Sequence, residues 1–345
     1  MRALITGGSG YFGSVLVKRL LLNNWDCRVF DINPFEGECA SEVEFLQGDI
    51  RDYDSVFKAC DGVDVVFHNV AQVPLAKNKN LFNSVNIDGT DNILLSSSKK
   101  GVNKLIYTSS SAVYGVPKLN PVNENMIPIP KESYGKAKYV AEKRCQKYIS
   151  SDLDIVIIRP RTILGHGRLG IFQILFEWIK QGINIPVLGN GDNVYQFIHA
   201  DDLAEAILLS ARPRIKSGIY NCGAEKYGTM REALENLCKY SKSGSQVKSV
   251  PFWPAVGGMK IFSLLGLSPL GAYHSLMYGR DMYFDISKSK NELSWKPKFS
   301  NDAMFQDSYD WYCSKRDKIF KNNKKGSHHQ SIVKEGVLSL VKKII

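Results

Sequence analysis

The chain has 345 residues and a formal net charge of +11, with 45 Lys and Arg against 34 Asp and Glu. Its length suits one large domain or two packed lobes, and a hydrophobic content of 44% is sufficient to form a core. Residues 314–345 hold nine of the basic residues and two acidic ones, so the rest of the chain is only mildly basic. Because no basic stripe with interleaved aromatic residues lies outside this end, we expect no nucleic-acid partner.

The cysteines and the apolar runs restrict the compartment of the protein. Seven cysteines are scattered along the chain without a Cys-x-x-Cys pair, which is typical of reduced thiols and indicates no metal site. No signal peptide precedes the first predicted strand, and no uncharged run is long enough to span a membrane. These observations predict a cytoplasmic protein, either free or at the inner face of the membrane.

The chain begins with a pattern that predicts dinucleotide binding. An apolar strand over residues 3–5 is followed by Gly7, Gly10 and Gly13 at the spacing G-x-x-G-x-x-G, and then by an apolar helix over residues 14–22. Glycine at these points permits a tight turn, a close approach of the backbone to phosphate, and close packing of the helix on the strand. The free N–H groups at the helix start attract the same phosphates. The alternative is an ordinary strand–helix turn.

Short apolar runs alternate with helical stretches through the first half of the chain. Further strands are predicted over residues 27–30, 44–46, 63–67, 104–108 and 155–158, and further helices around 52–60, 81–100 and 134–150. Continuous apolar strands separated by helices predict a parallel sheet covered on both faces. This is an α/β fold of the Rossmann type, a doubly wound parallel sheet with its ligand at the carboxyl ends of the strands.

Asp31, at the end of the second predicted strand, favours NAD over NADP. Its carboxylate can accept both ribose hydroxyls of an adenosine and would repel a 2′-phosphate. The next residues, 32–34, bring no arginine to this point, and Arg28 lies within the strand and is expected to point away. The alternative is an Asp that only caps a turn at the strand end.

Two segments carry the residues of a proton-transfer site. Residues 108–115 leave the fifth predicted strand and are rich in serine, and Tyr134 and Lys138 lie one turn apart on the following helix. A tyrosine with a pKa near 10 is a poor base at neutral pH, but a neighbouring ammonium group and the positive nicotinamide ring favour the phenolate. A serine hydroxyl can then supply a second hydrogen bond to the substrate oxygen. The alternative is a chance pattern on a helix.

Together these motifs resemble the extended short-chain dehydrogenase/reductases of the NAD-dependent epimerase/dehydratase family. The resemblance covers residues 1 to about 313, and its motifs are Thr6–Gly13, Gly48–Ile50, His68–Ala71, Asn86–Thr90, Ser109–Gly115, Tyr134-x-x-x-Lys138, Arg159-Pro160 and Phe197–Asp202. It implies that Ser110 is the catalytic hydroxyl beside Tyr134 and Lys138, and that the cofactor is NAD. The residues implied to bind NAD are Gly7, Gly10, Tyr11, Phe12, Gly13, Asp31, Asp49, Ile50, Val70, Ala71, Asn86, Tyr134 and Lys138.

Ser111 and Ala112 restrict the reaction class. Dehydratases of the family carry Asp-Glu at these positions, because elimination of water needs an additional acid and base, and alanine cannot transfer a proton. Oxidation, reduction and 4-epimerisation remain. The resemblance implies an NAD-dependent nucleoside-diphosphate-sugar 4-epimerase. The alternatives are a 3β-hydroxysteroid-type dehydrogenase acting on a hydrophobic alcohol and a non-catalytic NAD-sensing or scaffold protein.

The second half of the chain is expected to bind the substrate. The segment 185–191 resembles the strand that holds the nucleobase in sugar-nucleotide enzymes, which implicates Val187. Where many relatives carry Arg-Asp before Phe-Ile-His, this chain has Tyr195-Gln196, so Gln196 and the more distant Arg280 are the candidates for substrate contacts. The apolar stretch 251–270 is either a lid over a lipid-like substrate or ordinary core.

The expected organisation has three parts. Residues 1–165 form the NAD-binding domain, to which parts of 190–225 return; residues 166–313 form mainly the smaller C-terminal α/β substrate lobe; residues 314–345 form a basic tail. A homodimer is expected from the resemblance.

Within the basic tail, residues 314–330 predict a flexible linker and residues 331–345 a short helix. The apolar side chains that share one arc of this helix are Val333, Val337, Leu338, Leu340, Val341, Ile344 and Ile345. A basic amphipathic helix can lie in the headgroup region of an anionic membrane. The alternatives are a helix docked on the protein's own body or on a dimer partner, and a frayed tail.

Overall fold

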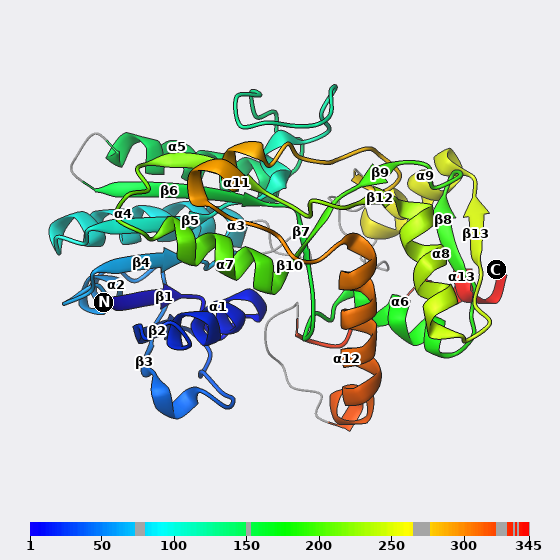
Figure 1. The fold of residues 1–345 in the computed structure, drawn as a ribbon, viewed down its shortest axis with the longest axis horizontal. Coiled ribbons are helices and arrows are strands. Elements are labelled where there is room, and N and C mark those ends of the chain that lie inside the picture. The colour runs from blue at the N-terminus through cyan, green and yellow to red at the C-terminus, as the bar shows by residue number, and fades with distance from the viewer. Residues whose placement is uncertain are drawn as a thin grey trace.

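A seven-stranded parallel sheet forms the N-terminal half of the protein, at the left of Figure 1. The computed structural model describes residues 1–72, 80–149, 153–264, 277–321, 330–333, 335–336 and 338–344. The sheet strands are β1 (Arg2–Thr6), β2 (Asp26–Asp31), β3 (Glu44–Gln47), β4 (Val65–His68), β5 (Lys104–Thr108), β6 (Asp154–Pro160) and β11 (Gly218–Cys222), in the order β11-β6-β5-β4-β1-β2-β3. The predicted doubly wound fold is confirmed, and the strand order reverses between β1 and β4, where such sheets bind ligands.

Helices cover both faces of this sheet. α1 (Tyr11–Leu21) and α7 (Ala200–Ser210) lie together on one face, and α2 (Tyr53–Ala59), α4 (Gly89–Lys99) and α5 (Ser133–Tyr148) cover the other. Successive residues of β1 therefore enter different cores: Ala3 and Ile5 pack with α1, and Leu4 packs in the cluster under α2 and α4. This explains why the strand sequences are continuously apolar and do not alternate.

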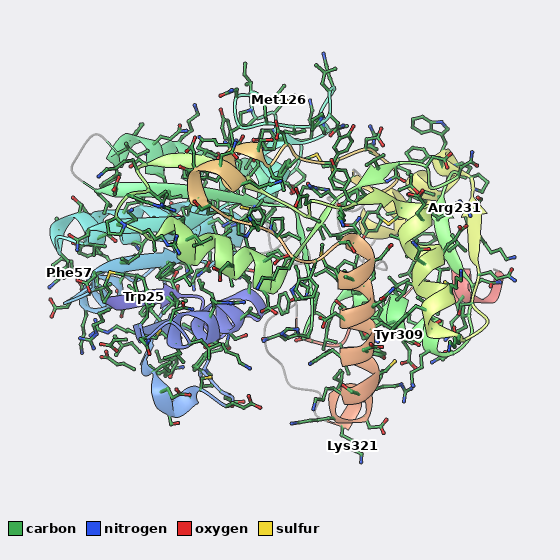
Figure 2. All side chains as sticks on the ribbon, in the orientation of Figure 1. Trp25, Phe57, Met126, Arg231, Tyr309 and Lys321 are labelled. Carbon is green, nitrogen blue, oxygen red and sulfur yellow. The ribbon has the colours of Figure 1, made fainter. Side chains whose placement is uncertain are left out.

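The smaller lobe, at the right of Figure 1, is built from short strand pairs and helices. Its elements are α6 (Ile171–Lys180), β8 (Ile185–Leu188), α8 (Met230–Ser241), β13 (Val247–Val250), α9 (Phe252–Leu264) and α12 (Asn301–Lys321). The remaining short elements of the chain, some of which belong to the sheet half, are η1 (Ala40–Glu42), η3 (Ser111–Tyr114), β7 (Thr162–Leu164), β9 (Val194–Tyr195), β10 (Phe197–His199), β12 (Gly228–Thr229) and α11 (Ser287–Leu293). α12 joins the lobe through aromatic contacts: Tyr309, labelled in Figure 2, meets Phe176 of α6 edge-on with ring centroids 6.0 Å apart.

Two predicted helical segments differ in the structure. The helix expected over 81–100 is divided into α3 (Asn80–Asn83), the wider π-helical turn η2 (Ser84–Asp88) and α4. The linker expected over 314–330 is wrong at its start, because α12 continues to Lys321, and residues 322–329 lie outside the described part. Of the apolar stretch 251–270, α9 covers residues 252–264, and residues 265–270 are likewise outside it.

The C-terminal segment folds back onto the smaller lobe. Its helix is shorter than predicted: α13 (Leu338–Ile344) begins after Gly336, whose φ of +53° does not belong to a helix. Val333, Leu338 and Val341 pack against the main core, as expected for a helix docked on the protein's own body. Val337 and Ile345 of the predicted arc lie outside the described residues. In the part of the chain that the structure describes, no helix has the length and apolar character needed to cross a bilayer.

Candidate active site

A cavity of about 980 Å³ extends from the glycine-rich loop to the smaller lobe. Its first half is lined by the loop after β1 and by the carboxyl ends of β2, β4 and β5, and its second half by α6, β8, α9 and α13. Of the residues predicted to bind NAD, those that line it are Gly7, Gly10, Tyr11, Phe12, Gly13, Asp31, Asp49, Ile50, Val70, Ala71, Tyr134 and Lys138.

The glycine-rich loop fits a dinucleotide diphosphate. Gly7 has φ of +72°, and a Cβ there would lie 3.0 Å from the backbone nitrogen of Val70. A Cβ at Gly13 would lie 2.0 Å from the carbonyl oxygen of Gly7, so only glycine lets α1 pack this closely. Gly10 is the N-cap of α1, and neither a capping side chain nor an acidic residue occupies this first turn. Its N–H groups therefore remain available for an anion.

Asp31 is the last residue of β2 and lies beside the glycine-rich loop. Its carboxylate accepts hydrogen bonds from the backbone N–H groups of Ser9 (3.1 Å) and Asn33 (2.9 Å). Burial raises the pKa of Asp31, and these hydrogen bonds oppose the rise. Arg28 points away, as predicted, with its Nε 2.8 Å from a carboxylate oxygen of Glu44.

Asn86 has a different position from the one predicted for a cofactor ligand. It is buried and is not part of the cavity wall. Its Oδ1 accepts a hydrogen bond from the backbone N–H of Gln72 (2.7 Å), and its Nδ2 donates to the Gln72 carbonyl (3.2 Å). The side chain thus holds the backbone of the loop that carries Val70 and Ala71.

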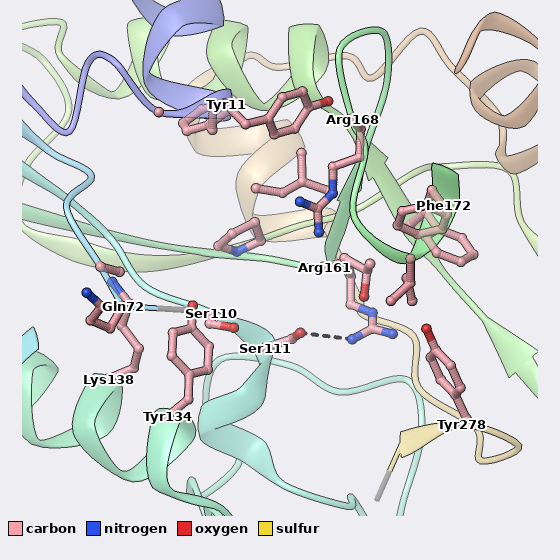
Figure 3. A pocket seen from close by; sticks show the side chains of 18 of the residues that line it. Tyr11, Gln72, Ser110, Ser111, Tyr134, Lys138, Arg161, Arg168, Phe172 and Tyr278 are labelled. Carbon is pink, nitrogen blue, oxygen red and sulfur yellow. Dashed lines mark hydrogen bonds between the residues drawn. The ribbon is translucent and has the colours of Figure 1, made fainter. Parts of the chain in front are cut away.

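Tyr134 and Ser110 lie side by side in the cavity wall, with the Tyr134 hydroxyl next to Ser110 (Figure 3). Tyr134 lies in the first turn of α5, where the side chain of Glu132 caps the helix by accepting from the backbone N–H groups of Tyr134 (2.7 Å) and Gly135 (2.6 Å). Burial raises the pKa of Tyr134 to about 12, while a hydrogen bond with Ser110 and the charge of Arg168 act to lower it. The sequence analysis attributed a lowered pKa of Tyr134 to Lys138 and the cofactor, and did not include Arg168.

Lys138 is fixed one turn further along α5. Its Nζ donates to the carbonyl oxygen of Thr108 (2.8 Å) and lies 4.7 Å from the ring centroid of Tyr107. Burial lowers the pKa of Lys138 to about 7. Below it, Arg159 and Glu142 form a buried ion pair (Nη2–Oε2, 2.6 Å), and Arg159 also donates to the hydroxyl of Tyr114. This pair joins α5 to β6 beneath the site.

Two arginines that the sequence analysis did not single out line the cavity. Arg161 follows β6, and Arg168 lies in the loop before α6. In Figure 3, Arg161 is joined to Ser111 by a dashed line, and the Arg168 side chain lies between Tyr11 and Arg161. The available signal was their proximity in sequence to the end of a sheet strand, where ligands bind.

Of the four predicted substrate residues, Ser110 and Val187 line this cavity. Gln196 is fully buried elsewhere: its Nε2 donates to the carbonyl of Ala224 (2.7 Å), and its Oε1 accepts from the backbone N–H of Phe284 (2.9 Å). Arg280 lines a separate, smaller hollow beside Asp281. Gln196 and Arg280, both predicted to contact substrate, therefore do not line the main cavity.

A cluster of two histidines and one carboxylate lies outside the cavity. Asp307 accepts from Nε2 of His199 (3.1 Å) and lies 3.4 Å from Nδ1 of His166. Nδ1 of His199 accepts from the backbone N–H of Asp201 (3.2 Å), which leaves Nε2 as the donor to Asp307. The cluster ties α12 to β10 and to the loop after β7.

A model of the NAD dependent epimerase/dehydratase family matches residues 3–223. The chain is 51% identical over 340 residues to the uncharacterized protein y4nG of Sinorhizobium fredii, covering 98% of this chain and 85% of that protein. It is 28% identical over 352 residues to UDP-glucose 4-epimerase 2 of Oryza sativa (89% and 81% covered). It is 29% identical over 343 residues to a 3 beta-hydroxysteroid dehydrogenase/Delta 5-->4-isomerase of Mycobacterium tuberculosis (91% and 90% covered).

The fold is similar to that of a solved UDP-glucose 4-epimerase. The crystal structure of this enzyme from Thermotoga maritima with UDP-glucose superimposes with a TM-score of 0.77 at 23% identity, covering 92% of this chain and 100% of that chain.

Proposed function

Because the chain belongs to the NAD-dependent epimerase/dehydratase family, we propose that it is a 4-epimerase of a nucleoside-diphosphate sugar. The observation that carries the proposal is the hydrogen bond between Tyr134 and Ser110 in the cofactor cavity. Ser110 is followed in the sequence by Ser111 and Ala112. Beside Tyr134, Ser111 and Ala112 stand at the two positions where dehydration needs an additional acid and base. Epimerisation at a carbinol carbon needs no proton-transfer group beyond Tyr134.

The chain's own groups have separate tasks in this reaction. The glycine-rich loop, Asp31 and Lys138 would hold NAD, which would supply the hydride acceptor and donor. Tyr134 takes the proton of the sugar hydroxyl and returns it to the same oxygen, so the site ends each turnover in its starting protonation state. Ser110 holds the substrate oxygen by a hydrogen bond.

A 3β-hydroxysteroid-type dehydrogenase is the second candidate, and the composition of the cavity wall favours it. The substrate half is lined largely by apolar side chains, among them Phe172, Leu175, Trp178, Met259 and Phe262. Such a wall suits a hydrophobic alcohol.

The two candidates differ in their redox balance. Purified protein with added NAD is incubated with UDP-glucose, UDP-N-acetylglucosamine or a 3β-hydroxysteroid, and NADH is followed by absorbance while the sugar is followed by proton NMR. An epimerase converts the sugar to its C4 epimer without net NADH. One NADH per steroid oxidised, with no sugar epimerised, would replace the first proposal by the second.

The expected homodimer is also a proposal. Light scattering during gel filtration measures it directly, and a mass near the 38.7 kDa of one chain would contradict it.

A further inference from the structure

Arg161 is a fully buried cation with an unused donor. Its Nη1 donates to Oγ of Ser111 (2.9 Å) and its Nε to the carbonyl oxygen of Gln196 (3.1 Å). Its Nη2 is buried and has no hydrogen-bond partner among the described residues. The guanidinium lies 4.6 Å from the ring centroid of Tyr195, so the side chain is held in place by contacts on several sides.

Among the described residues, Arg168 has two buried donor atoms without a hydrogen-bond partner, one more than Arg161. Both its Nε and its Nη1 are buried without a partner in the described part of the chain. The guanidinium is flanked by the rings of Tyr11 (5.5 Å to the centroid) and Phe172 (5.8 Å). Burial lowers the pKa of Arg168 only to about 10, so the group stays charged at neutral pH.

Neither arginine forms an ion pair with a carboxylate that the structure describes, which contrasts with the buried Arg159–Glu142 pair nearby. Leaving a buried charged donor unsatisfied is costly, and such groups are normally paired or hydrogen-bonded. A neutral alcohol would leave three guanidinium donors unsatisfied, whereas phosphate or carboxylate oxygens would satisfy them in the fork geometry that arginine prefers.

We infer that Arg161 and Arg168 form an oxyanion-binding pair for the substrate, in place of Gln196 and Arg280. The inference rests on the proposed function and adds an anionic group that the substrate must carry close to the reacting hydroxyl. The same oxygen chemistry has two possible sources, the diphosphate of a nucleotide sugar and the carboxylate of a uronic sugar. A neutral steroid provides neither.

The test measures binding, so that it does not depend on turnover. Calorimetric affinities of UDP, UDP-glucose and UDP-glucuronate are compared in the NAD-loaded wild type, Arg161→Met, Arg168→Met and, as the matched comparison, Arg280→Met. We expect Arg161→Met and Arg168→Met each to lower the affinity for the ligand whose anionic group they bind by about 10- to 100-fold, the usual effect of a hydrogen bond to a charged group. The Nε of Arg280 is also buried without a partner among the described residues, but Arg280 lines the separate hollow, so Arg280→Met should change these affinities less than about twofold.

The pattern across ligands identifies the source. Loss for all three ligands assigns the pair to the diphosphate, and loss confined to UDP-glucuronate assigns it to the carboxylate. Unchanged affinity for all three, or loss in Arg280→Met alone, would overturn the inference. NAD affinity and thermal unfolding of each variant, together with Arg161→Lys and Arg168→Lys, separate lost anion binding from misfolding. If the variants lose anion binding but the wild type epimerises no sugar, this inference stands and the epimerase proposal fails.

Discussion

Lys138 donates a 2.8 Å hydrogen bond from Nζ to the carbonyl oxygen of Thr108, the last residue of β5. The bond joins the first turns of α5 to the carboxyl edge of the sheet, next to Ser109 and Ser110. It also places an ammonium group in a site where burial lowers its pKa from the ordinary 10.5 to about 7. This difference makes the stability of the protein depend on pH.

The first prediction follows from that difference. Between about pH 7 and about pH 10, the unfolded chain binds a proton at Lys138 that the folded protein lacks, so the free energy of unfolding gains a contribution that rises with pH. Lys138→Met removes this contribution. Calorimetric melting of both proteins at the two pH values should show the wild type gaining stability relative to the variant as the pH rises. An equal difference in stability between the wild type and Lys138→Met at both pH values would contradict this prediction.

The second prediction concerns Tyr134. Tyr134→Phe keeps the ring packing but removes the group that accepts the proton, so kcat should fall by about 10²- to 10⁴-fold. NAD affinity and melting temperature should stay close to those of the wild type. Steady-state kinetics on the sugar substrate measure the change. Near-normal turnover would exclude Tyr134 as the proton-transfer residue.

The third prediction uses the pH profile of Arg168→Met. Because the charge of Arg168 acts to lower the pKa of Tyr134, its removal should raise that pKa and decrease the phenolate fraction at any given pH. The acid limb of the kcat profile, measured at saturating substrate, should therefore move to higher pH. Arg280→Met is the control, since Arg280 lies in the separate hollow. An unmoved profile would confine Arg168 to substrate binding.

The fourth prediction concerns cofactor choice. Asp31→Ala removes the carboxylate at the adenosine end of the cavity, and it should weaken NAD binding and narrow the difference between NAD and NADP. Fluorescence titration with both cofactors measures this. If the wild type already binds NADP more tightly than NAD, the interpretation of Asp31 is wrong.

The fifth prediction concerns the C-terminal segment. Leu338 and Val341 line the substrate half of the cavity. Two hydrogen bonds hold the segment on α6 and the residue after it: Nε1 of Trp178 donates to Glu335 (2.8 Å), and Lys342 donates to Oε1 of Gln181 (2.8 Å). A chain ending at residue 325 should show a KM for the sugar substrate raised about tenfold, since each of these partly buried side chains contributes a fraction of the about 1.5–3 kcal/mol of full burial.

The control for this truncation is NAD affinity, which should not change, because the glycine-rich loop lies in the other half of the cavity. An unchanged KM would contradict a role of the segment in substrate binding. Co-sedimentation of both chains with anionic vesicles at low and high salt tests the expected membrane contact separately. Equal sedimentation of the two chains would argue against that contact.

The sequence predicted the features that local patterns determine. The glycine spacing, the apolar strands and the Tyr134–Lys138 spacing each depend on residues within a few positions of one another, and the sheet and the helix-borne pair follow from them. Asp31 could be placed for the same reason, since the strand after the first helix ends at the ligand edge of a parallel sheet.

The substrate half could not be predicted in this way. Whether Gln196 faces the substrate depends on Ala224 and Phe284, which are distant in sequence and occupy its amide group. Likewise, Arg161 becomes an unsatisfied buried cation only because the surrounding elements pack around it without supplying a carboxylate. Such outcomes depend on tertiary contacts, and the spacing of nearby residues contains no information about them.

The docked C-terminal segment has a practical consequence for handling the protein. An affinity tag or reporter fused after Ile345 would extend from the segment that closes the substrate end of the cavity, and could disturb catalysis without affecting the fold. Met1 precedes the amino end of β1, away from the ligand edge of the sheet, and the two termini lie at opposite ends of the molecule in Figure 1. Fusions at the N-terminus are therefore the suitable choice for immobilisation and for every measurement of substrate affinity.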